Sequence, residues 1–415
     1  MICEICDHLW PALDDHDKLK FVGQIMPSPT LVLADYPIGF PSGFGETLYN
    51  LFSGFQTATL WSAHPVHNSP SKPLGKTVEL PSPSRPKWLP SRLSLAFYPA
   101  LKTRQLIASK RTAEQLSGFI GANSIKNLLV IPVSPWILSA ALRIHRQQSE
   151  LNLILFVMDD WQGHHESYDL PYSNRRRRLL SEAISRANKR FAVSREMAAH
   201  YEDSFGGTWQ IAHNGIDYES VSTNGKIVSQ PRKILLAGDI NVFRFDAVFA
   251  FAEALQRCSR RTNSTPELTI LGDVADEYAR PLSRLDVVRM LGRRSHSECL
   301  EAMRNTDLLY LPLAFSRKAT RISLYSLPTK LPEYLASGKT MLVHAPRESA
   351  VFRIAERYDL NPRLATIDDN KLDEFVTQWA EGKFNDSHND EDVKRALSSE
   401  FDLKTLAANF QSAFI

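Results

Sequence analysis

Residues 326–345 read SLPTKLPEYLASGKTMLVHA and contain the most informative pattern in the sequence. The loop around Pro328 leads into a predicted helix that runs to about Ser337, and Gly338 ends it. The apolar run at 340–345 then predicts a buried strand. A loop, a helix and a buried strand in this order indicate an α/β fold, in which helices cover both faces of a parallel sheet.

The same alternation of apolar strands and helical patterns extends outward from this segment. In the second half of the chain, strands are predicted at 233–238, 267–272, 286–292, 307–313 and 340–345. In the first half, they are predicted at 31–35, 57–61, 94–98, 127–133, 151–157, 190–194 and 209–214, with helices at 103–119 and 173–189 among them. Two Rossmann-like, doubly wound α/β domains that face each other across a cleft are therefore expected.

A polar stretch without periodicity, residues 217–232, separates the two series of strands and is the expected linker. We therefore predict an N-terminal domain at 1–216 and a C-terminal domain at 233–398. Residues 399–415 are expected to hold an amphipathic helix, since apolar residues recur at helical spacing from Leu403 to Phe414. This helix would either cap the second domain or cross back and pack on the first.

Composition favours a soluble enzyme of two domains. The chain has 415 residues, of which 43% are hydrophobic and 23% charged, and its net charge of +3 argues against disorder. Its four cysteines are too few and too scattered for a disulfide framework, so a reducing, cytoplasmic compartment is expected. No apolar run reaches the length of a membrane span, and the acidic N-terminus is unlike a signal peptide.

The loop and helix start within 326–333 have the chemistry of an anion site. Backbone N–H groups near 328–331 are expected to point outward at the positive end of the helix dipole, and Lys330 adds a full charge. Glu333, one turn further on, is able to accept hydrogen bonds from two vicinal hydroxyls, as on a ribose. Together these groups predict a nucleotide site. The alternative is a capped surface helix with an ordinary glutamate.

A second candidate is the loop PIGFPSGFG within residues 37–55. Gly43, Phe44 and Gly45 precede a predicted helix that begins near Glu46, so this loop is able to bring backbone N–H groups close to a ligand. A simple tight turn is the alternative, because G-x-G alone is a weak signal.

A third candidate lies at the end of the buried strand at 151–157, an edge at which α/β proteins bind ligands. Asp159 and Asp160 follow this strand and are able to orient or deprotonate an acceptor hydroxyl. The alternative, that Asp160 caps the following turn, carries equal weight. No metal is expected, since Cys3, Cys6 and the histidines near them lack the spacing of a zinc site.

Several segments resemble, in order and spacing, the retaining GT-B glycosyltransferases of family 4. Segment 326–345 is similar to their donor site, with matches at Leu327, Pro328, Thr329, Lys330, Glu333, Tyr334, Leu335, Ala336, Gly338 and Lys339. Counterparts of other family segments occur at 156–161, 213–217, 233–255, 267–273 and 290–312. The resemblance is densest from about residue 150 to 360.

The resemblance implies transfer of a sugar from a nucleotide-diphosphate sugar to a hydroxyl acceptor, with no metal cofactor. The second domain would bind the donor, and the first would bind a saccharide or lipid-linked acceptor. The implied donor-binding residues are Gly238, Arg244, Arg293, Pro328, Thr329, Lys330, Leu331 and Glu333. The implied catalytic residues are Asp159, Asp160, Arg244 and Lys330, whose cations would stabilise charge on the leaving diphosphate. The loop with Gly43, Phe44 and Gly45 would lie over the donor phosphates and the acceptor.

The sequence also departs from the family pattern. Tyr325 stands where many members carry the first glutamate of E-x7-E, which usually contacts the donor sugar. Asp239 stands where many members carry an arginine, so Arg244 is the one cation of that pair to be retained. Ser134 replaces a histidine that some members carry after the fourth strand. Other functions therefore remain open: a nucleotide-sugar epimerase on the same fold, or a non-catalytic nucleotide-sugar binding module.

Two basic tracts, 80–113 and 175–195, are either solvated helix faces or surfaces for an anionic lipid or acceptor. The tract at 80–113 interleaves aromatic residues with its cations, which slightly favours an anionic membrane surface and a peripheral location at the inner face of a membrane. No nucleic-acid partner is expected, because no motif for one is present. Envelope polysaccharide or glycolipid synthesis is the family-level expectation.

Overall fold

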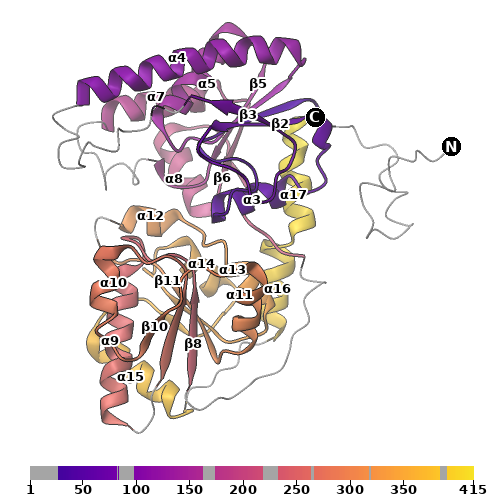
Figure 1. The fold of residues 1–415 in the computed structure, drawn as a ribbon. Helices are drawn as coiled ribbons and strands as arrows, with labels where there is room; N and C mark the ends of the chain where they lie inside the picture. The colour runs from indigo at the N-terminus through magenta and orange to yellow at the C-terminus, as the bar shows by residue number, and fades with distance from the viewer. Residues whose placement is uncertain are drawn as a thin grey trace.

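A computed structural model describes residues 27–81, 83, 98–161, 173–217, 232–262, 266–316, 319–383 and 390–415. The described chain forms two parallel β-sheets, each with helices on both faces (Figure 1). The first domain contains the first sheet and the second domain the other. This arrangement confirms the predicted α/β class with two doubly wound sheets.

The first sheet has the strand order β3-β2-β1-β4-β5-β6-β7. Its strands are β1 (Thr30–Leu33), β2 (Leu60–Pro65), β3 (Lys76–Leu80), β4 (Asn127–Val130), β5 (Asn152–Val157), β6 (Lys189–Ala192) and β7 (Gln210–Ile211). The helices that cover it include α3 (Gly43–Leu51), α4 (Tyr98–Ala122), α5 (Pro135–Gln147), α7 (Ser173–Arg186) and α8 (Arg195–Phe205). Alternate residues of β1 face different cores: Leu31 and Leu33 pack with α5, and Val32 packs with α3.

The second sheet has the order β10-β9-β8-β11-β12-β13. Its strands are β8 (Lys233–Ala237), β9 (Glu267–Leu271), β10 (Val288–Met290), β11 (Leu308–Pro312), β12 (Met341–His344) and β13 (Arg363–Leu364). Its helices are α9 (Phe245–Arg261), α10 (Asp276–Leu282), α11 (His296–Arg304), α12 (Thr320–Tyr325), α13 (Leu331–Ala336), α14 (Ala350–Arg357) and α15 (Asp369–Ala380). Crossover helices between parallel strands explain why both sheets consist of buried apolar runs.

The last elements are α16 (Asp390–Glu400), α17 (Leu403–Gln411) and a 3-10 helix at Ser412–Phe414. Helix α17 lies on the first domain against α3 (Figure 1). Phe410 packs on Phe52 with ring centroids 5.3 Å apart, and the carbonyl of Phe414 accepts a hydrogen bond from Asn127 Nδ2 at 3.0 Å. The apolar face of this helix therefore completes the core of the first domain.

Most predicted strands are confirmed, with exceptions. The strand predicted at 57–61 begins only at Leu60, because Thr57–Thr59 form a 3-10 helix. The strand predicted at 94–98 lies outside the described residues up to 97, and Tyr98 begins α4, so a helix stands at its last position. The edge strands β3 and β13 were not predicted, because only Leu80 is buried in β3 and β13 has two half-buried residues, so the apolar pattern is weak. Of the linker predicted at 217–232, only its end residues are described. No helix in the described part of the chain is long and apolar enough to cross a membrane.

Candidate functional site

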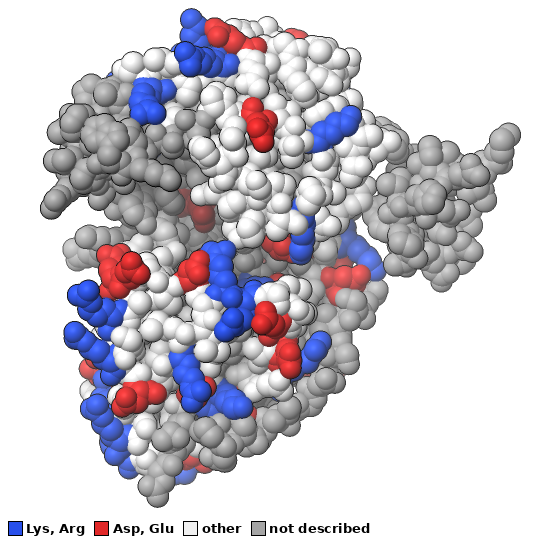
Figure 2. Space-filling model, viewed as in Figure 1, with Lys and Arg blue, Asp and Glu red and all other residues white. Residues whose placement is uncertain are grey.

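The loops predicted to bind ligand meet where the two domains face each other. A side chain added at Gly43 would place its Cβ 2.8 Å from Thr329 Oγ1, so the glycine lets the second domain come into close contact. Asn214 joins the same contact: its Nδ2 donates to the Thr329 carbonyl at 2.9 Å, and its Oδ1 accepts from Asn50 at 2.8 Å. On the face in Figure 2, acidic and basic side chains gather along this boundary.

The loop at residues 37–45, here called the glycine loop, leads into α3. Part of its backbone already has partners within the loop itself. Ser42 caps the helix, and its hydroxyl accepts the Gly45 N–H at 3.3 Å. A Cβ at Gly45 would lie 2.3 Å from the Phe40 carbonyl oxygen, so this glycine is required by packing within the loop. The expectation that the Gly45 N–H is aimed at a ligand is therefore wrong in this conformation; Gly43 and Phe44 stay candidates.

At the second loop, Lys330 and Glu333 form an ion pair, with Lys330 Nζ 2.8 Å from Glu333 Oε2. Their side chains are 28% and 12% exposed, so the pair is largely buried. The Leu331 N–H donates to the Pro328 carbonyl at 3.0 Å, which corrects the expectation that it is free for an anion. Thr329 faces the glycine loop, as described above. The cation and the carboxylate predicted for the nucleotide thus lie together.

Arg244 precedes α9 and lies against Gly238, where β8 ends. A Cβ at Gly238 would be 2.2 Å from Arg244 Nη1, and the glycine has a φ of +150°, which favours glycine. Burial lowers the pKa of the guanidinium, while neighbouring Tyr334 and Asp239 raise it. The Tyr334 hydroxyl accepts the Ala237 N–H at 2.7 Å. This geometry places a half-buried cation at the carboxyl end of the central strand of the second sheet.

Arg293 spans the two domains. Its guanidinium lies 2.7 Å from Asp239 Oδ2 and 2.6 Å from Asp273 Oδ2, and these carboxylates raise its pKa. Its Nη1 also donates to the Pro41 carbonyl in the loop before α3, at 3.1 Å. The donor role predicted for Arg293 would require it to leave these partners, so its observed role is to tie the glycine loop to the second domain.

The two adjacent acids after β5 have different environments. Asp159 is reached by solvent, and Ser326 Oγ of the second domain donates to its Oδ1 at 3.3 Å. The surrounding protein removes part of the water around the Asp159 carboxyl, which raises its pKa to about 6, and the negative charge of Asp160 adds to this effect. Asp159 is therefore an exposed carboxylate beside the second domain, and its role toward an acceptor stays a prediction.

Asp160 is fully buried and belongs to the domain interface. The Tyr201 hydroxyl donates to its Oδ1 at 3.0 Å, and Arg321 Nε of the second domain lies 3.2 Å from its Oδ2. Beside this pair, His200 stacks on Tyr325 with ring centroids 4.7 Å apart. In this arrangement Asp160 joins the two domains, and its predicted catalytic role and the alternative of a cap for the next turn both stay predictions.

The sequence reasoning missed Asp35, which follows β1. Its Oδ2 accepts the Ser134 N–H at the start of α5, at 2.9 Å. Burial raises the pKa of its carboxyl to about 6, and hydrogen bonds from Ser134 only partly offset this effect. The available signal was an acid directly after a buried strand, the same signal that identified Asp159.

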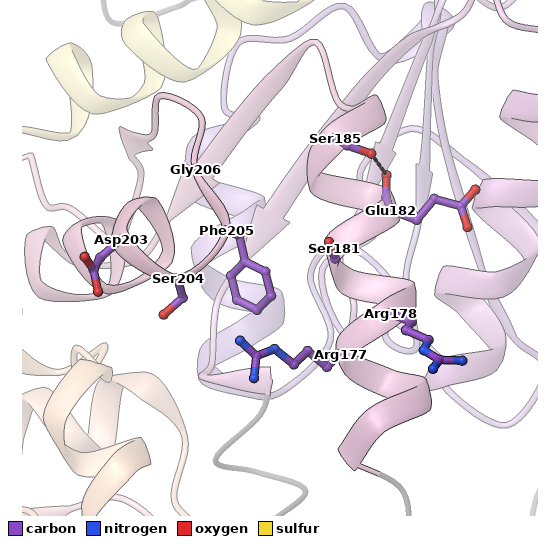
Figure 3. A pocket seen from close by; sticks show the side chains of 9 residues that line it. All are labelled: Arg177, Arg178, Ser181, Glu182, Ser185, Asp203, Ser204, Phe205 and Gly206. Atoms are coloured by element: carbon purple, nitrogen blue, oxygen red, sulfur yellow. Dashed lines mark hydrogen bonds between the residues drawn. The ribbon is translucent and has the colours of Figure 1, made fainter.

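Among the described residues, no group of three or more histidine, cysteine, aspartate or glutamate side chains is arranged to hold a metal ion. An open pocket of about 820 Å³ lies between α7 and the end of α8, away from the residues discussed above (Figure 3). Arg177 points toward the Phe205 ring there, 5.8 Å from its centroid. Glu182 in the same wall pairs with Arg146 and Arg186, which neutralises part of the basic tract 175–195.

No protein-family model and no curated protein matches this sequence. The fold, however, is similar to solved structures. One is the lipopolysaccharide outer core galactosyltransferase WaaB, with a TM-score of 0.59 and 14% identity over 92% of this chain and 98% of that one. Another is HepE from Anabaena in complex with UDP and glucose, with a TM-score of 0.63 and 13% identity over 92% and 98%.

A third is a trehalose-6-phosphate protein from E. coli bound with UDP-2-fluoro glucose, with a TM-score of 0.64 and 9% identity over 93% of this chain and 98% of that one. The similarity extends over both sheets of these structures. The chain therefore has the GT-B fold, as the sequence resemblance implied.

Proposed function

We propose that this chain is a retaining glycosyltransferase that moves a sugar from a nucleotide-diphosphate sugar to a hydroxyl acceptor. The observation that carries the proposal is the pairing of Lys330 with Glu333 beside the domain boundary. A cation and a carboxylate that neutralise each other can separate when a ligand offers each a better partner. A diphosphate supplies an anion for Lys330, and a ribose supplies two hydroxyls for Glu333.

The remaining donor contacts follow from the second domain. Arg244 lies at the carboxyl end of β8, where open α/β sheets bind ligands, and Gly238 gives its guanidinium the space to lie there. As the bond between sugar and phosphate breaks, negative charge grows on the diphosphate. Arg244 and Lys330 stabilise that charge more in the transition state than in the ground state. The proposal includes no metal ion.

The acceptor is proposed to lie on the first domain, with Asp159 at its hydroxyl. Retention, and a role in envelope polysaccharide or glycolipid synthesis at the inner face of a membrane, come from the family resemblance. The UDP and glucose in the HepE structure and the UDP-2-fluoro glucose in the E. coli structure support a nucleotide sugar as donor. We propose residues 233–398 as the donor domain, 1–216 as the acceptor domain, 217–232 as the linker and 399–415 as the returning helix.

The test is a calorimetric titration of UDP, GDP and dTDP into the wild-type chain and into Glu333→Ala. Loss of the carboxylate leaves two ribose hydroxyls unpaired, so the affinity for the diphosphate should fall by about 2–4 kcal/mol. Glu301→Ala, which removes an exposed carboxylate from α11, is the matched control and should bind normally. Equal affinity in Glu333→Ala and wild type would refute the assignment. Release of a sugar product only in the presence of an acceptor separates transfer from epimerisation and from binding alone.

A further inference from the structure

A cavity of about 450 Å³ lies where the chain passes between the two domains. Its walls come from β6, β7 and α8 of the first domain and from α16 and α17 (Figure 1). The two segments that connect the domains pair here: the Ile216 N–H donates to the Phe401 carbonyl at 2.9 Å, and the Leu403 N–H donates to the Ile216 carbonyl at 3.3 Å. Among the described residues that line this cavity, none belongs to the proposed donor site.

His213 lines the cavity and is 2% exposed. Its Nδ1 lies 2.9 Å from the Asn214 carbonyl, and a carbonyl oxygen only accepts, so Nδ1 carries the hydrogen. Burial lowers the pKa of the imidazole, so the ring is neutral at pH 7 and Nε2 has a free lone pair. No described residue donates to this nitrogen. Because buried polar atoms are usually hydrogen-bonded, Nε2 points to a ligand with a donor group.

Glu400, at the end of α16, is a second buried acceptor in the lining. Its side chain is 5% exposed, and its Oε2 accepts from Arg195 and from Tyr358, each at 3.1 Å. Arg357 Nη1 lies 3.4 Å from the same oxygen. All three donors thus reach Oε2, and no donor in the described part of the chain reaches Oε1. The two guanidinium groups offset the carboxylate charge, so a ligand requires a donor group here and no positive charge.

The rest of the lining combines apolar surface with groups that both donate and accept hydrogen bonds. Phe191 and Leu406 supply the apolar part, and the exposed side chains of Gln210, Thr405 and Asn409 supply amide and hydroxyl groups. The cavity volume is within the range of about 300–1,000 Å³ that is usual for small-molecule sites, and such sites have this mixed lining. A sugar ring, with C–H groups on its faces and hydroxyls at its edge, matches both parts.

We propose that this cavity binds a neutral saccharide, at a site separate from the donor and acceptor of the proposed reaction. Hydroxyl groups of the sugar donate to His213 Nε2 and to Glu400 Oε1, and the amides at the rim hold the others. An anionic sugar is disfavoured, because Arg195 is already paired with Glu400 and Asp402 adds a carboxylate to the same wall. The site is independent of the proposed function, since the residues that form it take no part in that reaction.

Two variants remove the site in different ways. In His213→Asn, the amide nitrogen is able to replace Nδ1 as donor to the Asn214 carbonyl, and the acceptor at Nε2 is lost. Asn409→Trp fills the cavity from an exposed position on α17 and leaves His213 in place. Ala408→Trp is the matched control, because Ala408 is exposed on the same helix and lies outside the described lining. Thermal unfolding checks that each variant folds.

The assay is calorimetric titration of glucose, galactose and maltose, with glucose 6-phosphate as the anionic probe. At least one neutral sugar should bind equally to wild type and Ala408→Trp. It should bind about fivefold more weakly to His213→Asn, the effect of one lost hydrogen bond, and not measurably to Asn409→Trp. Glucose 6-phosphate should bind wild type more weakly than glucose. In protein labelled with ¹⁵N-histidine, the His213 signals, identified by their loss in His213→Asn, should shift when the sugar is added.

Three results would overturn the proposal. Equal sugar affinity in wild type and Asn409→Trp would place the sugar elsewhere. Tighter binding of glucose 6-phosphate than of glucose would contradict a neutral ligand. Binding of none of the neutral sugars would leave a cavity filled by water. None of these results depends on nucleotide binding, so the titrations of UDP, GDP and dTDP test the proposed function separately.

Discussion

Replacing Asp35 by asparagine should stabilise the protein at neutral and alkaline pH. The carboxyl has a pKa of about 6 in the folded chain against 3.8 ordinarily, because burial disfavours its charged form. A raised pKa means that the folded state binds the proton more tightly than the unfolded state. The stability from this group is therefore fully present below about pH 4 and is lost as the pH rises through about 6.

The magnitude follows from the rise in the pKa of Asp35 from 3.8 to about 6. At about 1.4 kcal/mol per unit, the charged carboxylate costs up to about 3 kcal/mol above pH 7. Solvent reaches part of the side chain, and screening reduces this figure to about 1–2 kcal/mol. Asparagine carries no charge and retains an oxygen for the Ser134 N–H, so it should recover that amount.

The assay is urea unfolding of wild type, Asp35→Asn and Glu202→Gln, a control at an exposed carboxylate on α8, at pH 8 and at pH 4.5. The variant should unfold at higher urea than wild type at pH 8, and this advantage should be much smaller at pH 4.5. A variant that is no more stable than wild type at pH 8 would refute the reasoning. So would an equal difference at both pH values, because the effect would then not come from the charge.

Three other predictions concern the interface, the cations and the membrane. Arg321→Ala removes the ion-pair partner of the buried Asp160, so unfolding stability should fall by about 3 kcal/mol; a change below about 0.5 kcal/mol would contradict a buried pair. Arg244→Ala and Lys330→Ala should lower kcat more than they raise the donor KM, and activity should persist in EDTA; a change in KM alone, or full dependence on magnesium or manganese, would contradict transition-state stabilisation by these cations. Sedimentation with anionic vesicles should exceed that with neutral vesicles and should fall with salt, since cations of tract 80–113 are screened; equal recovery in the supernatant with both vesicles would exclude the membrane surface.

Local patterns in the sequence were sufficient for the α/β class and for most strands. Apolar runs such as 127–133 and 151–157 mark strands because both faces of a parallel sheet are buried, and this burial is visible in composition alone. Strand β3 was not predicted because an edge strand with one buried residue lacks that apolar pattern. The short loop with Lys330 and Glu333 was also accessible, since its residue types and spacing are local.

Partners across long sequence separations were not accessible from such patterns. The amphipathic pattern predicts that one face of α17 is buried but does not identify what covers it. The packing of Phe410 on Phe52 shows that this face lies on the first domain. The adjacent acids Asp159 and Asp160 look alike in sequence, yet only Asp160 meets Arg321, a residue of the other domain. The physical reason is that periodicity reports how much of a side chain is buried, whereas an ion pair depends on which distant residue the folded chain brings within about 4 Å.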